Sequence, residues 1–532
     1  MAARGAGDMG TVRRRIAGWV YILLPVILWS ILASLHFASD SQILYSWDSA
    51  SYLEAAQSLV NGDGLIHRVI AGFEPAMWEP MALWPPAYPI LIAAVNLLGV
   101  PLPEAGVVVA IISAAVFVML LGWISLRLFP PGIASLIVAV TVAMPDFLRF
   151  TTSCLSEAPY MAFTAAALAC AIAWSDRKYR AGGVLFAAGV FAAAAWAVRN
   201  AGLALLPTMG MFVVGISIWR HRRVVRSLCI WMAGAGLIIV PVLARNLTSF
   251  GDLNPYRRPP SDLSITHNAK EAVKLMAYDL TALPKTAIAG VVVIAGVALT
   301  IACLRSRRSL VRAAAAVHPA TWLLGTYGLL LVILLVVARS QYHWGETIYS
   351  RYLLPVYWVV WICVAQAGLK ILEAVGWSSR RRNATVALTL GAFFVLQLRA
   401  EIQALRTPPE NWESLDISIT EETAAALAAR VPPDRFVLAS RAYLWRVFAN
   451  VNARKTPAYP FAAGPYASMI TPKEVEDACK RGSLWGIVAD DPEGMHRGDY
   501  GSFLQGLAGR STSVSWLEES EIGGVAVFRC RE

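Results

Sequence analysis

The chain has few charged residues. Only 15% of its 532 residues are Asp, Glu, Lys or Arg, whereas 57% are hydrophobic and the mean hydropathy is +0.54. A soluble protein usually has about a quarter of its residues charged. The composition therefore excludes an ordinary soluble protein and indicates a polytopic membrane protein.

Metal and nucleotide motifs are missing as well. The sequence has no CxxC, HExxH or other Cys/His spacing typical of a metal site, and no Walker or GxGxxG loop. Five of the seven cysteines lie in or beside apolar runs, where cysteine is an ordinary small hydrophobic residue. The other two, Cys479 and Cys530, could form one disulfide in an oxidising compartment. No cofactor is predicted, and dependence on a divalent metal stays open.

Apolar runs near spanning length predict about eleven transmembrane helices. They cover residues 17–38, 105–129, 132–144, 158–174, 181–198, 201–219, 227–244, 287–304, 320–338, 352–372 and 384–398. The first run is long and lacks a small-residue cleavage site, so we interpret it as a retained anchor rather than a secretory signal.

Basic clusters predict how these helices are oriented, because cytoplasmic loops are enriched in Lys and Arg. The clusters lie at 13–15, 127, 177–180, 220–226, 305–312 and 380–382. All six fall on one side only if the short run 87–98 does not cross the membrane. Prolines and Gly99 bound this run, which predicts an interfacial or re-entrant helix. The net charge of +11 then reflects topology, and no nucleic-acid partner is predicted.

The less regular segments meet on the opposite, extracytoplasmic side. They comprise loops at 39–98, 145–157, 245–286 and 339–350 and the C-terminal part of the chain. There, RFVLAS and LWGIVAD predict buried strands, TEETAAALAARV a helix, and SVSWLEE with GGVAVFRC a hairpin. The predicted fold is mainly α: a membrane helix bundle over 1–400 and a small extracytoplasmic α/β domain over 401–532. The N-terminus would be cytoplasmic, and the Ala/Arg-rich composition is compatible with a bacterial inner membrane.

The segment WDSASYLEAAQSLVNGDG, directly after the first apolar run, carries a carboxylate on an amphipathic helix. Its apolar positions 52, 55, 56, 59 and 60 share one helical face. The helix is too short to span and ends at Gly62 and Gly64. We expect it to lie in the membrane interface, apolar face down, with Asp48 at its polar N-terminal edge.

The extracytoplasmic loops and helix ends supply ionisable side chains for an active site at the membrane surface. The acidic candidates are Asp48, Asp146 and Glu157, and the basic candidates include Arg199, Arg245 and Arg351, the last followed by Tyr352. Arginine can hold a phosphate through a bidentate charge-assisted pair. A nearby carboxylate can take a proton from a hydroxyl. This combination suits transfer from a lipid-linked phosphate.

Each candidate also has a purely structural interpretation. Asp48 could only cap its helix, and a helix N-terminus would lower the pKa of its carboxyl, which favours orienting a hydroxyl over strong base catalysis. Glu157 could start the next span, and Asp146 could be a loop residue. The arginines could extend to lipid headgroups, and Arg351 with Tyr352 could anchor a helix at the interface.

Five segments in order resemble one family. They are WDSASYLEAAQSLVNGDG, WPPAYPIL, LSEAPYMAF, VRNAGLALLP and SRYLLPVYW. In this order they are similar to the integral-membrane glycosyltransferases of the GT-C type, within them the family 39 and aminoarabinose-transferase-like group that uses polyprenyl-phosphate sugars. The resemblance covers most of the membrane part and says little about the chain after residue 400.

The resemblance implies inverting sugar transfer from a polyprenyl-phosphate donor to a hydroxyl of a glycan, lipid or protein. Asp48 matches the acidic residue that binds or deprotonates the acceptor, with Glu157 or Asp146 as a second acid. Arg351 and Arg199 would stabilise the leaving phosphate. One position departs from the pattern: Trp84 stands before the paired prolines, where the aminoarabinose transferases usually have lysine, so either phosphate binding is arranged differently or the donor differs.

Three other functions remain as alternatives. A lipid-linked glycan polymerase or ligase would use the same surface and similar arginines. A transporter would need charged or broken helices near the membrane midplane, and the spans carry almost no charge there. A non-catalytic scaffold would leave the gathered acids and arginines without a role.

Overall fold

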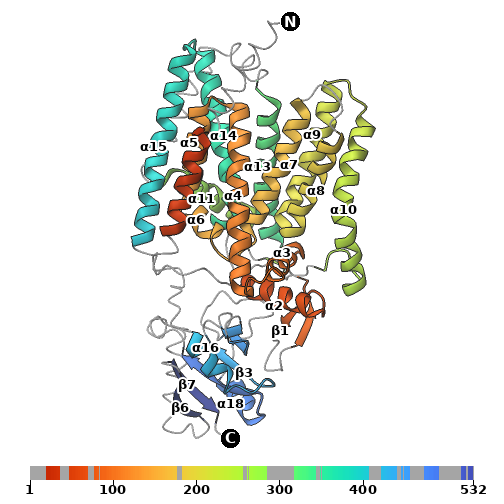
Figure 1. Cartoon of the computed structure of the whole chain (residues 1–532), viewed down its shortest axis with the longest axis vertical. Helices are drawn as coiled ribbons and strands as arrows, with labels where there is room; N and C mark the ends of the chain where they lie inside the picture. The colour runs from red at the N-terminus through yellow and green to blue at the C-terminus, as the bar shows by residue number, and fades with distance from the viewer. Residues whose placement is uncertain are drawn as a thin grey trace.

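The protein was analysed as a computed structural model. It describes residues 20–35, 47–69, 77–82, 84–176, 182–255, 260–261, 263–283, 317–342, 348, 350–406, 421–439, 445–446, 449–455, 472–489, 517–522 and 525–530. Within these residues, a bundle of long apolar helices stands above a smaller sheet-containing part, and the two lie at opposite ends of the molecule (Figure 1).

Seven helical segments of the described chain are long and apolar enough to cross a membrane. They are α4 (Leu102–Leu128), α7 (Glu157–Asp176), α9 (Leu205–Trp219) with the 3-10 turn Asn200–Ala204 before it, α10 (Val224–Phe250), α13 (Pro319–Gln341), α14 (Ser350–Ala374) and α15 (Ser379–Arg406). All seven coincide with predicted spans. The protein is therefore a mainly helical, polytopic membrane protein, as the composition indicates.

Four other predicted spans have different outcomes. The span at 132–144 forms α5 (Pro131–Val142), which is bent by 69° against α6 (Pro145–Thr151), so the two together make at most one broken span. Two shorter apolar helices, Val20–Leu35 and α8 (Gly182–Val198), correspond to the runs at 17–38 and 181–198. The span at 287–304 lies outside the described residues.

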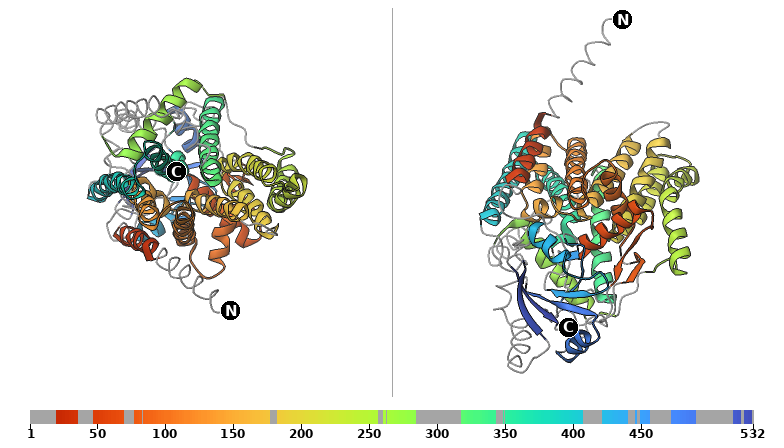
Figure 2. Two further views of the ribbon diagram at one scale, coloured as in Figure 1. Left: turned by 90° about the horizontal axis from the view of Figure 1, so that it is seen from above. Right: turned by 60° about the horizontal axis from the view of Figure 1, so that its bottom comes forward.

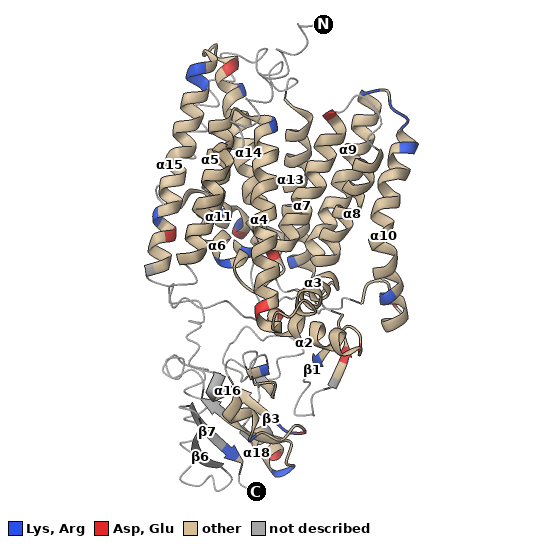
Figure 3. Ribbon diagram, viewed as in Figure 1, with Lys and Arg blue, Asp and Glu red and all other residues tan. Residues whose placement is uncertain are grey.

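Positive charge gathers at one end of the bundle. Figure 3 shows Lys and Arg at the ends of α10, α14 and α15 that point away from the C-terminal sheet. These ends include the described basic clusters at 220–226 and 380–382, and Arg127 lies in the last turn of α4. The clusters at 13–15, 177–180 and 305–312 lie outside the described residues. The charged ends and the C-terminal sheet thus flank the bundle from opposite sides.

Two short helices lie under the bundle on the side of the sheet. α2 (Trp47–Asn61) packs against α3 (Ala87–Asn96), α4 and strand β1 (Ile66–Val69), which pairs antiparallel with β2 (Met77–Pro80). α3 has only 10 residues, as expected for a helix that does not span. The apolar face of α2 differs from the prediction: Tyr52, Ala55 and Ala56 are buried by these neighbours instead of facing lipid.

The C-terminal part contains the predicted strands. The sheet has the order β4-β3-β5-β7-β6, with β3, β4 and β5 parallel and β6 and β7 forming an antiparallel hairpin. The elements are α16 (Glu421–Ala428), β3 (Phe436–Ala439), β4 (Asn452–Lys455), α18 (Pro472–Lys480), β5 (Leu484–Ala489), β6 (Leu517–Ile522) and β7 (Val525–Cys530). A disulfide joins Cys479 of α18 to Cys530 of β7. In the two further views the sheet lies below the middle of the bundle (Figure 2).

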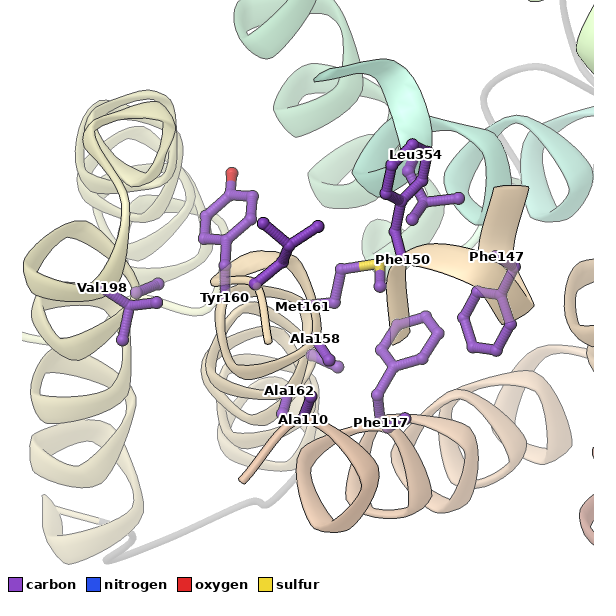
Figure 4. Packing of buried hydrophobic residues seen from close by; sticks show 14 of the residues in the cluster. Ala110, Phe117, Phe147, Phe150, Ala158, Tyr160, Met161, Ala162, Val198 and Leu354 are labelled. Carbon is purple, nitrogen blue, oxygen red and sulfur yellow. The ribbon is translucent and has the colours of Figure 1, made fainter. Parts of the chain in front are cut away.

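The bundle core combines small and aromatic residues. Figure 4 shows Ala110 of α4 facing Ala158 and Ala162 of α7, where the absence of large side chains lets the two helices approach. Beside them, Phe117 packs against Phe147 with ring centroids 5.8 Å apart. The bent α5–α6 pair is therefore held by aromatic contacts at its break, next to the site described below.

Two glycines allow α8 and α10 to cross closely. A Cβ atom on Gly189 would lie 2.1 Å from the carbonyl oxygen of Trp231, and one on Gly234 would lie 2.1 Å from that of Phe186. Such contacts are impossible, so only glycine allows this crossing. Small residues commonly permit close packing of membrane helices.

Gly234→Ala should therefore force α8 and α10 apart and lower the thermal midpoint of the purified protein by several degrees. Overpacking of this kind costs about 1–3 kcal/mol. Gly236→Ala is the matched control, because a Cβ there meets nothing within 4 Å. Equal midpoints for the two variants, measured by thermal unfolding in detergent, would show that the crossing is looser than described.

Candidate active site

Asp48 lies in the first turn of α2, at the end of the bundle that faces the sheet. Its side chain is 23% exposed and forms an ion pair with Arg351 in the first turn of α14. The indole Nε1 of Trp84 donates a hydrogen bond to Oδ1 of Asp48 at 3.1 Å. Burial disfavours the charged carboxylate. The positive charges of Arg351 and Arg199 and the hydrogen bonds from Arg351 and Trp84 outweigh this effect, so the pKa of Asp48 lies below its usual range. Asp48 is therefore ionised at neutral pH.

Glu157 joins two arginines behind Asp48. It is the first residue of α7, and its side chain is 1% exposed. Its Oε1 lies 2.7 Å from Nη1 of Arg199 and 3.0 Å from Nε of Arg351. Arg351 thus bridges the two carboxylates, and side chains from four separate segments of the chain meet here. A buried carboxylate needs such pairing, since an isolated charge would be very unfavourable there.

Neutral hydroxyl groups lie next to these charged side chains. Arg199 donates from Nη1 to Oγ of Ser156 at 3.1 Å, and Tyr52 of α2 donates to the same oxygen at 3.3 Å. Oγ of Ser49 donates to the carbonyl of Cys154 at 2.7 Å. These bonds fix α2 to the segment before α7, so the relative positions of Asp48 and Glu157 are set by several contacts.

Three guanidinium groups surround the ring of Tyr352. The distances from Cζ to the ring centroid are 4.1 Å for Arg339, 5.3 Å for Arg351 and 5.5 Å for Arg199. Cation–π attraction favours this arrangement. With Asp48 and Glu157 included, the group carries a formal charge of +1. It presents preorganised positive charge at the end of a membrane bundle, which suits a phosphate.

The two remaining predicted substrate-binding residues contact other parts of the chain. Arg245, near the end of α10, donates from Nη2 to the carbonyl oxygen of Met81 at 2.7 Å and lies 5.4 Å from the ring of Phe250. Asp146, in the first turn of α6, lies within hydrogen-bonding reach of Ser350, the residue before Arg351. Binding of substrate by either residue stays a prediction.

Asp146 belongs to a second carboxylate pair that the sequence did not indicate. Its neighbour is Asp279 of α11 (Ile265–Thr281), which accepts a hydrogen bond from the hydroxyl of Tyr357. Burial and the nearby Asp146 raise the pKa of Asp279 to about 7. Asp279 lies inside an amphipathic helix without any motif around it, so no local signal marked it.

Two further contributors to the main site also escaped prediction. In the sequence, Trp84 is distinctive only because it stands where a lysine is expected. In the structure it donates a hydrogen bond to Asp48. Arg339 directly follows a predicted span, where an arginine commonly only anchors a helix. Among the described residues, no three His, Cys, Asp or Glu side chains gather in a way that could hold a metal ion.

Comparison with solved structures identifies the fold. No family model matches the chain, and no curated protein matches its sequence. Solved structures do match: ArnT from Cupriavidus metallidurans bound to undecaprenyl phosphate has a TM-score of 0.55 at 12% identity, over 96% of this chain and 98% of that one. The apo form of the same protein gives 0.51 at 12% identity, over 97% and 98%. The oligosaccharyltransferase of Archaeoglobus fulgidus in complex with Zn and sulfate gives 0.50 at 11% identity, over 87% and 67%.

These neighbours define the class of fold. All are GT-C membrane glycosyltransferases, and the ArnT match covers nearly the whole of both chains. The similarity to the GT-C type that the five sequence segments indicate is thereby confirmed at the level of the fold. At 11–12% identity the comparison shows the fold alone, and the reaction has to be inferred from the residues of the site.

Proposed function

We propose that the protein transfers a sugar from a polyprenyl-phosphate donor to an acceptor hydroxyl, with inversion at the sugar carbon. The observation that carries the proposal is the group of Arg199, Arg339 and Arg351 around Tyr352, placed against Asp48 and Glu157 at one end of a membrane bundle. A lipid-linked phosphate would reach this end from the membrane, and an acceptor would reach Asp48 from outside the bundle.

The contacts support a division of roles. Asp48 accepts a hydrogen bond from the acceptor hydroxyl and so aims its oxygen at the sugar carbon. That oxygen bonds to the carbon on the face opposite the phosphate, the bond from carbon to phosphate oxygen breaks, and its electron pair leaves with the phosphate. The hydroxyl proton passes to Asp48 and then to water. Because the pKa of Asp48 is lowered, orientation contributes more than base strength.

The arginines stabilise the leaving group. Charge grows on the bridging phosphate oxygen as the bond breaks, and preorganised donors at that position lower the barrier without rearranging. Glu157 holds Arg199 and Arg351 in place and offsets part of their positive charge. Arg339 adds positive charge at 4.1 Å from the centre of the Tyr352 ring.

The proposed setting is a bacterial inner membrane, with the site and the C-terminal domain on the extracytoplasmic side. The separation of the basic helix ends from the site supports this orientation, because cytoplasmic ends of membrane proteins are rich in Arg and Lys. The partners would be a polyprenyl-phosphate sugar, a glycan, lipid or protein acceptor, and the surrounding lipid.

Binding of undecaprenyl phosphate to the purified full-length protein tests the proposal first. It should raise the thermal midpoint by several degrees at saturating lipid phosphate, because a ligand that binds only the folded state stabilises it. Undecaprenol without the phosphate should give a much smaller shift. Sugar transfer from a panel of polyprenyl-phosphate sugars in native membranes then tests the reaction. Equal shifts with undecaprenol and undecaprenyl phosphate would contradict a phosphate site.

A further inference from the structure

A second charged group lies apart from the active site and joins the first loop to the C-terminal part of the chain. Glu54 of α2, Arg68 of β1 and Arg446 are all at least 94% buried. Arg446 donates from Nε and Nη2 to the two carboxylate oxygens of Glu54 at 2.9 and 2.5 Å, a bidentate pair. Arg68 donates from Nε to the same carboxylate at 2.8 Å.

Hydrogen bonds from arginine side chains to backbone carbonyls also join the two parts, with donors on both sides. Arg446 also donates to the carbonyl oxygen of Arg68 at 2.8 Å, and Arg68 donates to the carbonyls of Arg446 and Asn450 at 3.2 and 3.3 Å. These pairs are separated by up to 382 residues in the sequence. Buried charges with this many partners are costly to separate, because each would be left uncompensated. The contact is therefore specific in geometry and strongly directional.

The same helix carries Glu54 and Asp48. α2 has 15 residues, and the two carboxylates lie six positions apart on it, so a contact that fixes Glu54 also fixes Asp48. A second connection runs through β1. His67, next to Arg68, packs edge-on against the ring of Trp84 at 5.7 Å, and Trp84 donates to Asp48. Both connections lead from Arg446 to the acceptor side of the proposed site.

We propose that Arg446 is a positioning residue, through which the C-terminal domain holds α2 and thereby keeps Asp48 against Arg351. The role of Arg446 in catalysis rests on the proposed function. The structural link from Arg446 to Asp48 does not depend on it. The C-terminal domain then contributes to the structure of the active site.

Arg446→Met in the full-length protein is the test. It removes only the link between the parts, because Glu54 and Arg68 still form a neutral pair inside the first loop. Arg446→Lys keeps the charge but not the bidentate geometry, so it should restore the behaviour in part. Arg529→Met is the matched control: it removes an arginine of β7 that lies 5.4 Å from the Trp485 ring, within the C-terminal sheet.

Two measurements report on the link. Hydrogen exchange of the α2 amides should become at least ~10-fold faster in Arg446→Met and stay near wild type in Arg529→Met. Carbodiimide labelling, which needs a protonated carboxyl, should modify Asp48 at higher pH in Arg446→Met, because a carboxylate that drifts from Arg351 loses the charge that lowers its pKa. Arg446→Lys should give values between those of Arg446→Met and Arg529→Met in both measurements.

Wild-type exchange of α2 together with a wild-type pH profile of Asp48 labelling would overturn the proposal. So would equal changes in Arg529→Met, since they would show general loosening of the domain. If Arg446→Met does not fold, the same two readouts on Arg446→Lys decide. Absence of undecaprenyl phosphate binding by the wild type would contradict the proposed function and leave these measurements on α2 fully interpretable.

Discussion

Replacing Asp48 with Asn should reduce sugar transfer by about 10²–10⁴-fold, the usual range for losing a positioned acid–base group. The amide keeps the size of the side chain but loses the negative charge that accepts the acceptor hydroxyl and pairs with Arg351. Transfer measured in membranes that contain equal amounts of each protein checks this. Binding of undecaprenyl phosphate should persist, because the arginines remain.

The same variant separates catalysis from helix capping. Asn stabilises a helix N-terminus about as well as Asp, so a purely capping Asp48 would be replaced by Asn almost without effect. Asp63→Asn is the matched control, an exposed carboxylate just beyond the C-terminal end of the same helix. Near-wild-type turnover in Asp48→Asn would rule out the role proposed for this carboxylate.

The sequence allowed the elements of the site to be predicted better than their partners. Asp48, Glu157, Arg199 and Arg351 were candidates, and the structure brings all four together. The charge pattern predicts on which side of the membrane a residue lies, and each of these four lies at a helix end on the same side. It carries no information on lateral position, so the pairing of Asp48 with a residue 303 positions away had to come from helix packing.

The residues that escaped prediction share a physical reason. Glu54 occupies the polar face of α2, and a polar face normally meets water, yet here Arg446 of the C-terminal part covers it. For the same reason α2 was expected to rest on lipid, whereas α3 and α4 bury its apolar face. Amphipathicity shows that a helix has two faces without showing what covers each. By contrast, the structure contains the disulfide between Cys479 and Cys530 that the sequence left possible; these two cysteines stand out because the others lie in or beside apolar runs.

Arg351→Met should have the second large effect, because this one side chain contacts both carboxylates of the site. Loss of a preorganised donor to the charge that develops in a transition state costs about 10²–10³-fold in rate. We expect a loss of at least this size in transfer, together with weaker binding of undecaprenyl phosphate. Arg351→Lys should recover little, since an ammonium group cannot reproduce the planar fork that reaches two partners. Transfer rates and thermal shifts with undecaprenyl phosphate measure the two effects separately.

Arg127→Met provides the matched control, because Arg127 pairs with Asp176 at the other end of the bundle and is 45% exposed. Wild-type lipid-phosphate binding in Arg351→Met would contradict the placement of the phosphate.

The pH dependence of activity gives an independent test of the contact between Arg351 and Asp48. Arg351 lowers the pKa of Asp48, so the wild-type enzyme should lose activity on acidification only below the ordinary range of an aspartate, about pH 4. In Arg351→Met burial still raises this pKa, while Arg199 and Trp84 alone oppose it. The acid limb of the remaining activity should therefore move to higher pH. A shift in the opposite direction would mean that Asp48 is not the group whose ionisation the reaction requires.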